Sequence, residues 1–269
     1  MISTYARRLL LAGFLSFLLP ILLPILAVCA SAQVYVFGQA SFVTGGNPDS
    51  VLSADLNSDG RLDLIVGNRD SNSITVLLGK PDGTFAPGVD YVVGKGPGAL
   101  ISGDFNGDGI EDLAVINADE NTVSILLGKG DGTFQGFATL ATGGVPTAIA
   151  TGDLNQDGKL DLVVANDPSR VSIWLGNGDG SFQTRQDFST GDSPVALTVN
   201  DFNADGKLDL AVVSQSSNTV SILLGNGDGT FRSHVDYSSG KGPVSVASGD
   251  FNRDGFVDLI VANDLLPKN

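Results

Sequence analysis

A nine-residue acidic pattern recurs five times along the chain and constrains its fold more than any other feature. The pattern is D-x-N-x-D-G-x-x-D, and its copies begin 49, 49, 48 and 49 residues apart, at Asp55, Asp104, Asp153, Asp201 and Asp250. A fixed period of this size means that each unit is one supersecondary element stacked on its neighbours. The period therefore predicts a repeat architecture and argues against a single irregular enzyme domain.

The negative charge of the chain is concentrated in these motifs. The formal net charge is −15, with 15 Lys plus Arg against 30 Asp plus Glu, and three Asp from each of the five loops account for 15 of those acids. A nucleic-acid partner needs a basic face for its phosphates, which this composition does not provide. We therefore expect no nucleic acid as a partner.

The first 32 residues are typical of a signal peptide. Two arginines precede an apolar run over residues 9–28, and Ala30-Ser31-Ala32 offers a small-x-small cleavage site before Gln33. The run is long enough to remain as a membrane anchor, but Pro20 and Pro24 interrupt it, so we expect cleavage. The predicted mature chain is then secreted or held at the cell surface, with no membrane insertion. Cys29 is the only cysteine, so the mature chain is expected to lack disulfides.

Short strands and tight turns fill the space between the loops. Each loop is followed by an apolar run such as LDLVVAN (160–166), and then by a second apolar segment such as RVSIWLG (170–176). Short Val/Ile/Leu segments bounded by Gly and Asn are buried strands more readily than helices. We expect the run after each loop to be an inner strand that neighbouring units cover on both faces. A third strand follows, and a fourth leads into the next loop.

A Gly-rich turn ends each second segment. It reads KPDGTF, KGDGTF, NGDGSF or NGDGTF, and Asp-Gly supplies the positive φ angle that a hairpin turn needs. The aromatic residue that closes the turn is expected to pack back on the core, and these residues are Phe85, Phe134, Phe182 and Phe231.

Four short strands in a 49-residue unit match the blade of a β-propeller. A β-helix has shorter coils, and leucine-rich or helical repeats have other patterns. The prediction is an all-β fold over residues 33–269, a β-propeller of about five four-stranded blades with one acidic loop per blade. Residues 40–55 align without a gap on residues 138–153, which predicts an outer strand at the N-terminal end. Only 11 residues follow Asp258, so the last blade is expected to lack its third strand and hairpin turn.

These residues resemble the FG-GAP/VCBS repeat family, the blade type also found in integrin α-subunits. The resemblance rests on the acidic loop, the L-D-L run after it and the downstream G-N-G-D-G-T-F turn, and it covers residues 34–263. It implies a calcium-loaded extracellular propeller, but by itself it implies no ligand. Propellers of this family commonly have seven blades. The chain is therefore compatible with an incomplete propeller, part of a seven-bladed ring, or a five-bladed ring with one defective blade.

The loops themselves predict calcium sites. Ca²⁺ takes six to eight oxygen ligands, and alternate positions of a tight loop converge on one point, with Gly109 and its counterparts allowing the turn. Zn²⁺ or copper is disfavoured by all-oxygen ligation, and Mg²⁺ keeps more of its waters. The predicted ligands are side chains at positions 1, 3, 5 and 9 and the carbonyl at position 7 of each loop: Asp55, Asn57, Asp59, Arg61, Asp63; Asp104, Asn106, Asp108, Ile110, Asp112; Asp153, Asn155, Asp157, Lys159, Asp161; Asp201, Asn203, Asp205, Lys207, Asp209; and Asp250, Asn252, Asp254, Phe256, Asp258.

Two other interpretations of the loops are weaker. A plain turn needs neither three carboxylates nor an Asp at position nine, where an unpaired charge entering a buried strand would be costly. An EF-hand or dockerin loop places a Glu at position twelve, whereas these loops place valine there (Val66, Val115, Val164, Val212 and Val261).

The function predicted from the sequence is a binding or adhesion module for an extracellular glycan or protein, with structural calcium. One alternative is a polysaccharide-acting enzyme (a lyase or a hydrolase) or the accessory domain of such an enzyme. The other is a fragment of a longer surface protein. We expect no enzyme, because His234 is the single histidine and its segment is typical of an ordinary outer strand.

Trp174 replaces a repeated Leu, and we expect it to pack within a blade although an exposed Trp could stack on a sugar. Tyr91, Tyr237 and Phe188 are expected to be packing residues on outer strands.

Overall fold

The structure, a computed structural model, describes residues 41–264. The chain divides into two units, residues 1–40 and residues 41–269. The predicted signal peptide and its cleavage site lie outside the described residues, so both stay predictions. The description below concerns the second unit alone.

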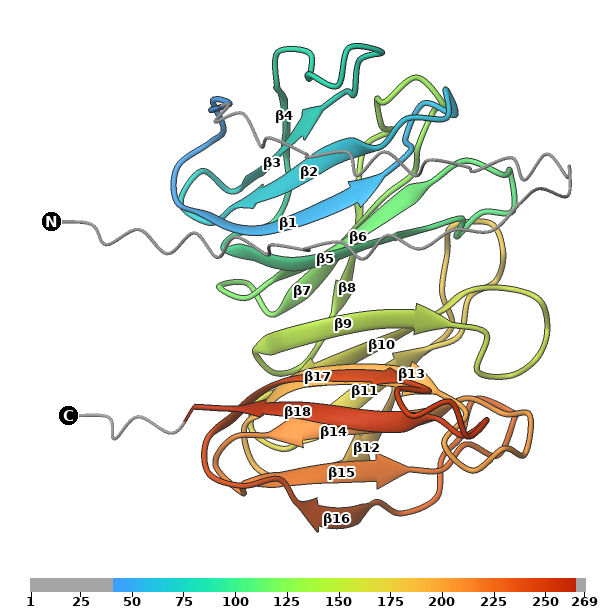
Figure 1. Cartoon of the computed structure of the whole chain (residues 1–269). Helices are drawn as coiled ribbons and strands as arrows, with labels where there is room; N and C mark the ends of the chain where they lie inside the picture. Colours follow the sequence, from blue (N-terminus) through green and yellow to red (C-terminus); the bar gives the residue numbers. More distant parts are fainter. Residues whose placement is uncertain (1–40, 265–269) are drawn as a thin grey trace, which may run out of the picture. The chain divides into compact units, whose positions relative to one another are not determined.

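The described residues form eighteen short strands in five antiparallel sheets (Figure 1). Four sheets have four strands each and the fifth has two. The first strands of the sheets are β1 (Pro48–Ala54), β5 (Pro97–Gly103), β9 (Pro146–Gly152), β13 (Pro194–Asn200) and β17 (Pro243–Gly249). The second strands are β2 (Asp63–Asn68), β6 (Asp112–Asn117), β10 (Asp161–Asn166), β14 (Asp209–Ser214) and β18 (Asp258–Asn263). The third strands are β3 (Ser73–Leu77), β7 (Thr122–Leu126), β11 (Arg170–Trp174) and β15 (Thr219–Leu223), and the fourth are β4 (Val89–Val92), β8 (Ala138–Ala141), β12 (Gln186–Ser189) and β16 (Val235–Ser238).

Strands follow one another within each sheet in chain order, and the first strands of consecutive sheets lie side by side. The acidic loop therefore joins the first strand of a sheet to the second. The apolar run after the loop is the second strand, an inner strand of the sheet as predicted, and the innermost strand precedes the loop. Radially repeated four-stranded sheets of this kind form an open β-propeller.

Three of the second strands, β6, β10 and β14, are buried on both faces, as predicted. All six residues of β6, β10 and β14 are buried, because a strand lies on each side in the sheet and neighbouring sheets cover both faces. Three apolar clusters fill the spaces between consecutive complete sheets. A strand covered on every side tolerates the nearly continuous Val/Ile/Leu/Ala run that the sequence shows.

Of the four phenylalanines in the Asp-Gly turns between the third and fourth strands, Phe134, Phe182 and Phe231 pack back on the core as predicted, where they contact the preceding sheet. Gly132 has a φ of 79° and its counterparts match it closely, so these turns use the left-handed region that glycine adopts without cost. The Phe134 ring then lies 5.3 Å from that of Tyr91 on β4, and the Phe231 ring lies 5.4 Å from that of Phe188 on β12. Two outer strands, β4 and β12, are therefore tied to the turn of the following sheet.

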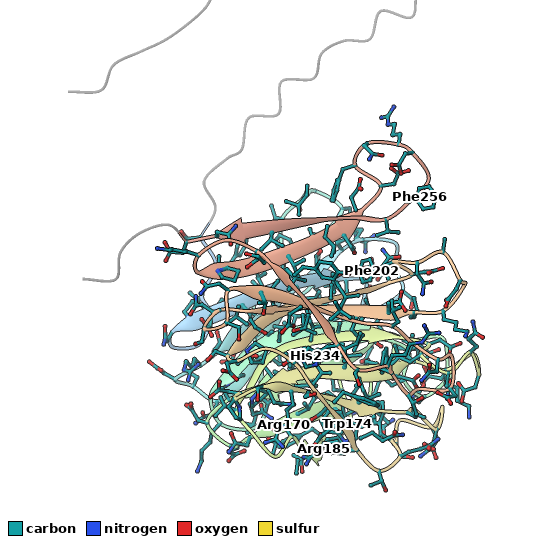
Figure 2. The ribbon with its side chains drawn as sticks, turned by 90° about the horizontal axis from the view of Figure 1, so that it is seen from below. Arg170, Trp174, Arg185, Phe202, His234 and Phe256 are labelled. Carbon is teal, nitrogen blue, oxygen red and sulfur yellow. The ribbon has the colours of Figure 1, made fainter. Side chains whose placement is uncertain are left out.

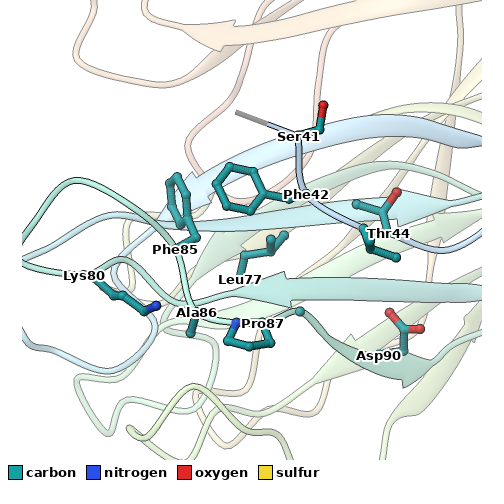
Figure 3. A pocket seen from close by; sticks show the side chains of 11 residues that line it. Ser41, Phe42, Thr44, Leu77, Lys80, Phe85, Ala86, Pro87 and Asp90 are labelled. Carbon is teal, nitrogen blue, oxygen red and sulfur yellow. The ribbon is translucent and has the colours of Figure 1, made fainter. Parts of the chain in front are cut away.

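The described start of the chain differs from the prediction of an outer strand. Residues 41–47 form no strand. Even so, Phe42 lies 49 residues before Tyr91 and packs edge-to-face on Phe85 at 5.4 Å, as Tyr91 packs on Phe134 (Figure 3). The segment thus supplies the aromatic contact of an outer strand without the strand pairing.

Only four of the five predicted blades are complete within residues 41–264. The last sheet contains β17 and β18 alone, and its third strand and hairpin turn are absent from the described residues, as the unit spacing predicts.

Candidate metal centres in the acidic loops

The five acidic loops share one backbone conformation. The glycine at position six has a positive φ, such as 80° at Gly109 and 88° at Gly255, and position four is also left-handed, with φ of 60° at Gln156 and 58° at Ala204. The predicted role of glycine in the sharp turn is therefore confirmed. Because the turn is tight, the side chains at positions one, three and five all fold over the same stretch of backbone.

Side-chain oxygens at positions one and three meet on one backbone N–H. In the second loop, the N–H of Asp108 is donated to Asp104 Oδ1 at 3.2 Å and to Asn106 Oδ1 at 2.9 Å. Asp104 Oδ2 accepts from the N–H of Gly109 at 2.8 Å, and Asp108 Oδ1 accepts from the N–H of Ile110 at 2.9 Å. The other four loops repeat these contacts with donor–acceptor distances of 2.7–3.1 Å.

The ninth-position aspartate has a different set of partners. Asp112 is fully buried at the start of β6, and its two oxygens accept from the N–H groups of Phe105 at 2.9 Å and Gly128 at 2.7 Å. Asp63, Asp161 and Asp209 make the corresponding pair of bonds in their own sheets. The carboxylate thus ties the acidic loop to the end of the third strand.

Burial raises the pKa of the Asp112 carboxyl above its ordinary value, and the nearby charges of Asp108 and Asp104 raise it further. The two backbone N–H bonds act in the opposite direction but do not cancel the effect. The pKa values of Asp161 and Asp209 are raised for the same reasons. The loops therefore hold buried and half-exposed carboxylates close enough to repel one another.

The donor chemistry suits Ca²⁺, because each loop offers carboxylate and amide oxygens and no nitrogen or sulfur donor. Within residues 41–264, however, no three acidic, His or Cys side chains gather closely enough to form a metal cluster. Positions one, three and five converge, while position nine bonds to the backbone. A carboxylate has about four lone-pair sites, so an oxygen that accepts one N–H can still ligate a cation. The ligand roles predicted for all five positions stay predictions.

Three of the loops have further features. In the first loop the Arg61 guanidinium pairs with Asp59, and in the third loop Lys159 Nζ lies 3.8 Å from Asp157 Oδ2, so each of these loops has a cation on one predicted ligand. In the last loop, Asp258 accepts from the N–H of Phe251 at 3.1 Å. Its second partner in the complete sheets is the glycine after the third strand, which the described part of the last sheet does not contain. Phe256 projects from this loop with 62% of its surface exposed (Figure 2).

A second polar network occurs at the opposite end of the second strands of the first three sheets, and the sequence analysis missed it. Asn68, Asn117 and Asn166 are fully buried, and each donates its side-chain N–H to a Ser or Thr hydroxyl on the third strand at 2.8–2.9 Å. In the first and third sheets, that hydroxyl in turn donates to an aspartate of the fourth strand at 2.6 Å. The signal was present as the Asn that closes most of the apolar runs.

The other candidate residues take structural positions. Trp174 is 3% exposed in the core between the second and third sheets, so packing in a blade is confirmed. Phe188 is half-buried and Tyr91 is half-buried, but Tyr237 is 58% exposed, which the prediction of a packing role did not anticipate. His234 precedes β16, with its Nε2 3.7 Å from Asp236.

No helix in residues 41–264 has the length and apolar character to cross a membrane.

Comparison with known repeats decides the family. The FG-GAP-like repeat matches residues 55–115, 104–164, 153–212 and 201–261, each match running from one acidic loop through the apolar run after the next. The chain belongs to the FG-GAP-like repeat family. A search of the curated proteins found no match.

Solved structures similar to this FG-GAP-like chain share its fold at low sequence identity. A lectin from Agrocybe aegerita, described as recognising non-reducing terminal N-acetylglucosamine, has a TM-score of 0.51 at 21% identity and covers 78% of this chain. The periplasmic gluconolactonase PpgL of Pseudomonas aeruginosa has a TM-score of 0.55 at 17% identity over 80% of this chain, and a Lactobacillus plantarum protein has 0.56 at 19% over 75%. The chain spans only 56–60% of the length of these three structures.

Proposed function

We propose that this FG-GAP-like propeller is a calcium-stabilised binding module for glycans or proteins. The observation that carries the calcium part is the fivefold repetition of one loop conformation in which oxygens from positions one and three meet on a single N–H. Bound calcium would neutralise carboxylates that otherwise repel one another at the edge of a buried strand. Its role in the proposal is structural.

The binding part of the proposal rests on the contrast between strands and turns. The second strands repeat nearly the same apolar sequence, whereas the turns that follow them read RDSN (69–72), ADEN (118–121), DPS (167–169) and QSSN (215–218). The residues of these turns are mostly polar, and each is exposed or half-buried. A rigid scaffold that presents variable polar loops is the usual arrangement for recognition. The Agrocybe aegerita lectin supports a sugar as one candidate ligand, although the likeness extends to the fold alone.

A glycan array read in two buffers tests this function. The purified chain is applied once with millimolar calcium and once with chelator, beside a variant in which Asp104, Asn106 and Asp108 are all replaced by alanine. We expect retention on one glycan class in calcium and loss of that retention in chelator. A calcium-loaded, folded chain that binds no glycan, and that captures no protein from an extracellular protein array, would contradict the binding role.

A further inference from the structure

A pocket beside the outer strand of the third sheet carries arginines at positions where the other complete sheets have none. Its volume is about 340 Å³, and its lining is Pro168, Ser169, Arg170, Asp187, Phe188 and Ser189. Arg185 lies next to it, just before β12 (Figure 2 labels both arginines). The pocket thus belongs to the complete third sheet and to DPS (167–169), one of the variable polar turns.

Both arginines depart from the repeat. Arg170 begins β11, and the residues that begin the other third strands are Ser73, Thr122 and Thr219. Arg185 follows it at a distance of 15 residues, and the residues at this distance in the other sheets are Gly88, Phe137 and His234. Two changes to arginine in one sheet of an otherwise regular array indicate a role that the scaffold itself does not require.

One carboxylate holds both guanidinium groups. Arg185 Nε donates to Asp187 Oδ1 at 2.9 Å, and Arg170 Nη1 lies 3.5 Å from Asp187 Oδ2. The buried polar network of the third sheet ends at the same carboxylate, because the Ser172 hydroxyl donates to Asp187 Oδ1 at 2.6 Å. The equivalent aspartates of the first and fourth sheets accept the same hydroxyl bond, but no arginine within residues 41–264 pairs with them.

The second sheet fixes the two arginines from the other side. Arg185 Nη1 donates to the carbonyl of Ala141, and Arg170 Nη2 donates to that of Gly143, both at 2.8 Å. Arg185 Nη2 makes no hydrogen bond within the described residues, and the two arginine side chains are 28% and 32% exposed. Two oriented guanidinium groups therefore share one carboxylate, which leaves a positive charge in excess. The planar fork of a guanidinium suits the two oxygens of a second carboxylate.

The acidic loops lie at the other end of the strands. The loop of the third sheet ends at Asp161, and β10 runs from there to Asn166, which pairs with Arg170. Five steps of about 3.3 Å make this separation about 16 Å, which is about twice the screening length of about 8 Å at physiological ionic strength. Asp167 is nearer, but within the described residues it forms no ion pair with either arginine. An anion can therefore approach the pocket in spite of the net charge of −15.

We propose that this pocket binds the carboxylate of a uronic acid unit in an acidic glycan, an inference that rests on the proposed glycan-binding function. The carboxylate accepts N–H bonds from Arg170 and Arg185. Ser169 and Ser189 offer hydroxyls to the sugar, and Pro168 offers apolar surface to its C–H groups. A volume of about 340 Å³ is at the small end for ligand pockets, so it suits a single sugar ring better than an extended acidic peptide.

NMR titration of the full chain in millimolar calcium at pH 8 tests the site. Methyl β-D-glucuronide and methyl α-D-galacturonide are each titrated beside the corresponding neutral methyl glycoside, with the Nε–H signals of Arg170 and Arg185 as reporters. We expect at least one uronide to saturate, to bind about tenfold more tightly than its neutral counterpart, and to shift both signals.

The variants follow from the repeat. Arg170→Thr and Arg185→His copy the fourth sheet, and each should weaken uronide binding about tenfold. Arg185→Lys keeps the charge but loses the planar fork, so it should weaken binding too. Lys80→Gln, at an exposed position of the first sheet, should leave binding unchanged. Because both arginines also tie the third sheet to the second, each variant is checked by thermal unfolding, and Arg185→Lys decides if the other two do not fold.

Three outcomes would overturn the proposal. The first is equal binding of uronides and neutral glycosides, or no saturable uronide binding to the folded chain. The second is uronide binding that the arginine variants leave unchanged. The third is tighter binding of the acidic peptide acetyl-DEDE-amide at the same arginines, which would assign the pocket to a protein partner. Retention of the chain on a neutral class of the glycan array would in each case leave the proposed function standing, so the two failures are distinguishable.

Discussion

The second strands of the third sheet and the last sheet have nearly the same sequence and very different surroundings. β10 reads DLVVAN and β18 reads DLIVAN. All six residues of β10 are buried, whereas no residue of β18 is buried and two are exposed. β10 lies between β9 and β11, while within residues 41–264 β18 pairs with β17 alone. The burial of such a strand is therefore conferred by its neighbours, as expected for repeat units that cannot cover their apolar faces alone.

The ninth-position aspartates should show the largest difference between the two sheets. Asp161 accepts two backbone N–H bonds in a fully buried position, and Asp258 accepts one in a half-buried position. Asp161→Ala leaves two buried donors unpaired, so we expect a loss of about 3 kcal/mol in the free energy of unfolding, against about 1 kcal/mol for Asp258→Ala. Urea unfolding of both variants in chelator measures the difference without a contribution from calcium. Equal losses would show that the buried bonds are not what distinguishes the two sheets.

A matched pair of valines gives the next largest effect. Val164 in β10 is 0% exposed, and its counterpart Val261 in β18 is partly exposed. Removing two methyl groups from a close-packed site leaves a cavity, so Val164→Ala should cost about 2 kcal/mol and Val261→Ala about 1 kcal/mol or less. Thermal unfolding of the two variants tests this expectation.

The repeat and the strands could be predicted from the sequence because each is a local, periodic signal. The acidic loops, the Asp-Gly turns and the burial of the apolar runs all follow from residue type and spacing, and the structure has them where the sequence places them. The order of strands in a sheet could not be derived in this way. Whether the strand before or after the loop is innermost depends on contacts between units 49 residues apart. The sequence of the run LDLVVAN does not indicate these contacts.

The site was predicted less completely than the fold. Spacing identified the oxygen donors, but it could not show that Asp112 would bond to the N–H groups of Phe105 and Gly128. Gly128 lies 16 residues later in the sequence, just after β7. The buried Asn117 was missed for a related reason, because its partner Ser124 becomes a neighbour only when β6 and β7 pair.

The smallest expected effect is a dependence of stability on pH that arises in the Asp-Gly turns. Within the described residues, the complete sheets contain these turns and the last sheet does not. Hydrogen bonds from the Thr133 hydroxyl and N–H lower the pKa of the Asp131 carboxyl below its ordinary value of 3.8. A depressed folded-state pKa stabilises the fold above the unfolded pKa, and this contribution is lost as the pH falls from about 4 through the folded value. NMR titration should find Asp131 ionised at pH values where a free Asp is protonated. In Thr133→Val, its pKa should return toward the ordinary value; an unchanged pKa would contradict the assigned cause.

Calcium titration calorimetry on the purified, calcium-stripped chain tests the central claim most directly. The account predicts saturable binding at about five sites in a folded protein, with a rise in melting temperature because calcium binds the folded state in preference. The variant with Asp104, Asn106 and Asp108 replaced by alanine should lose one site and keep the others. A chain that is folded in chelator, shows no binding heat and melts at the same temperature with and without calcium would contradict the claim.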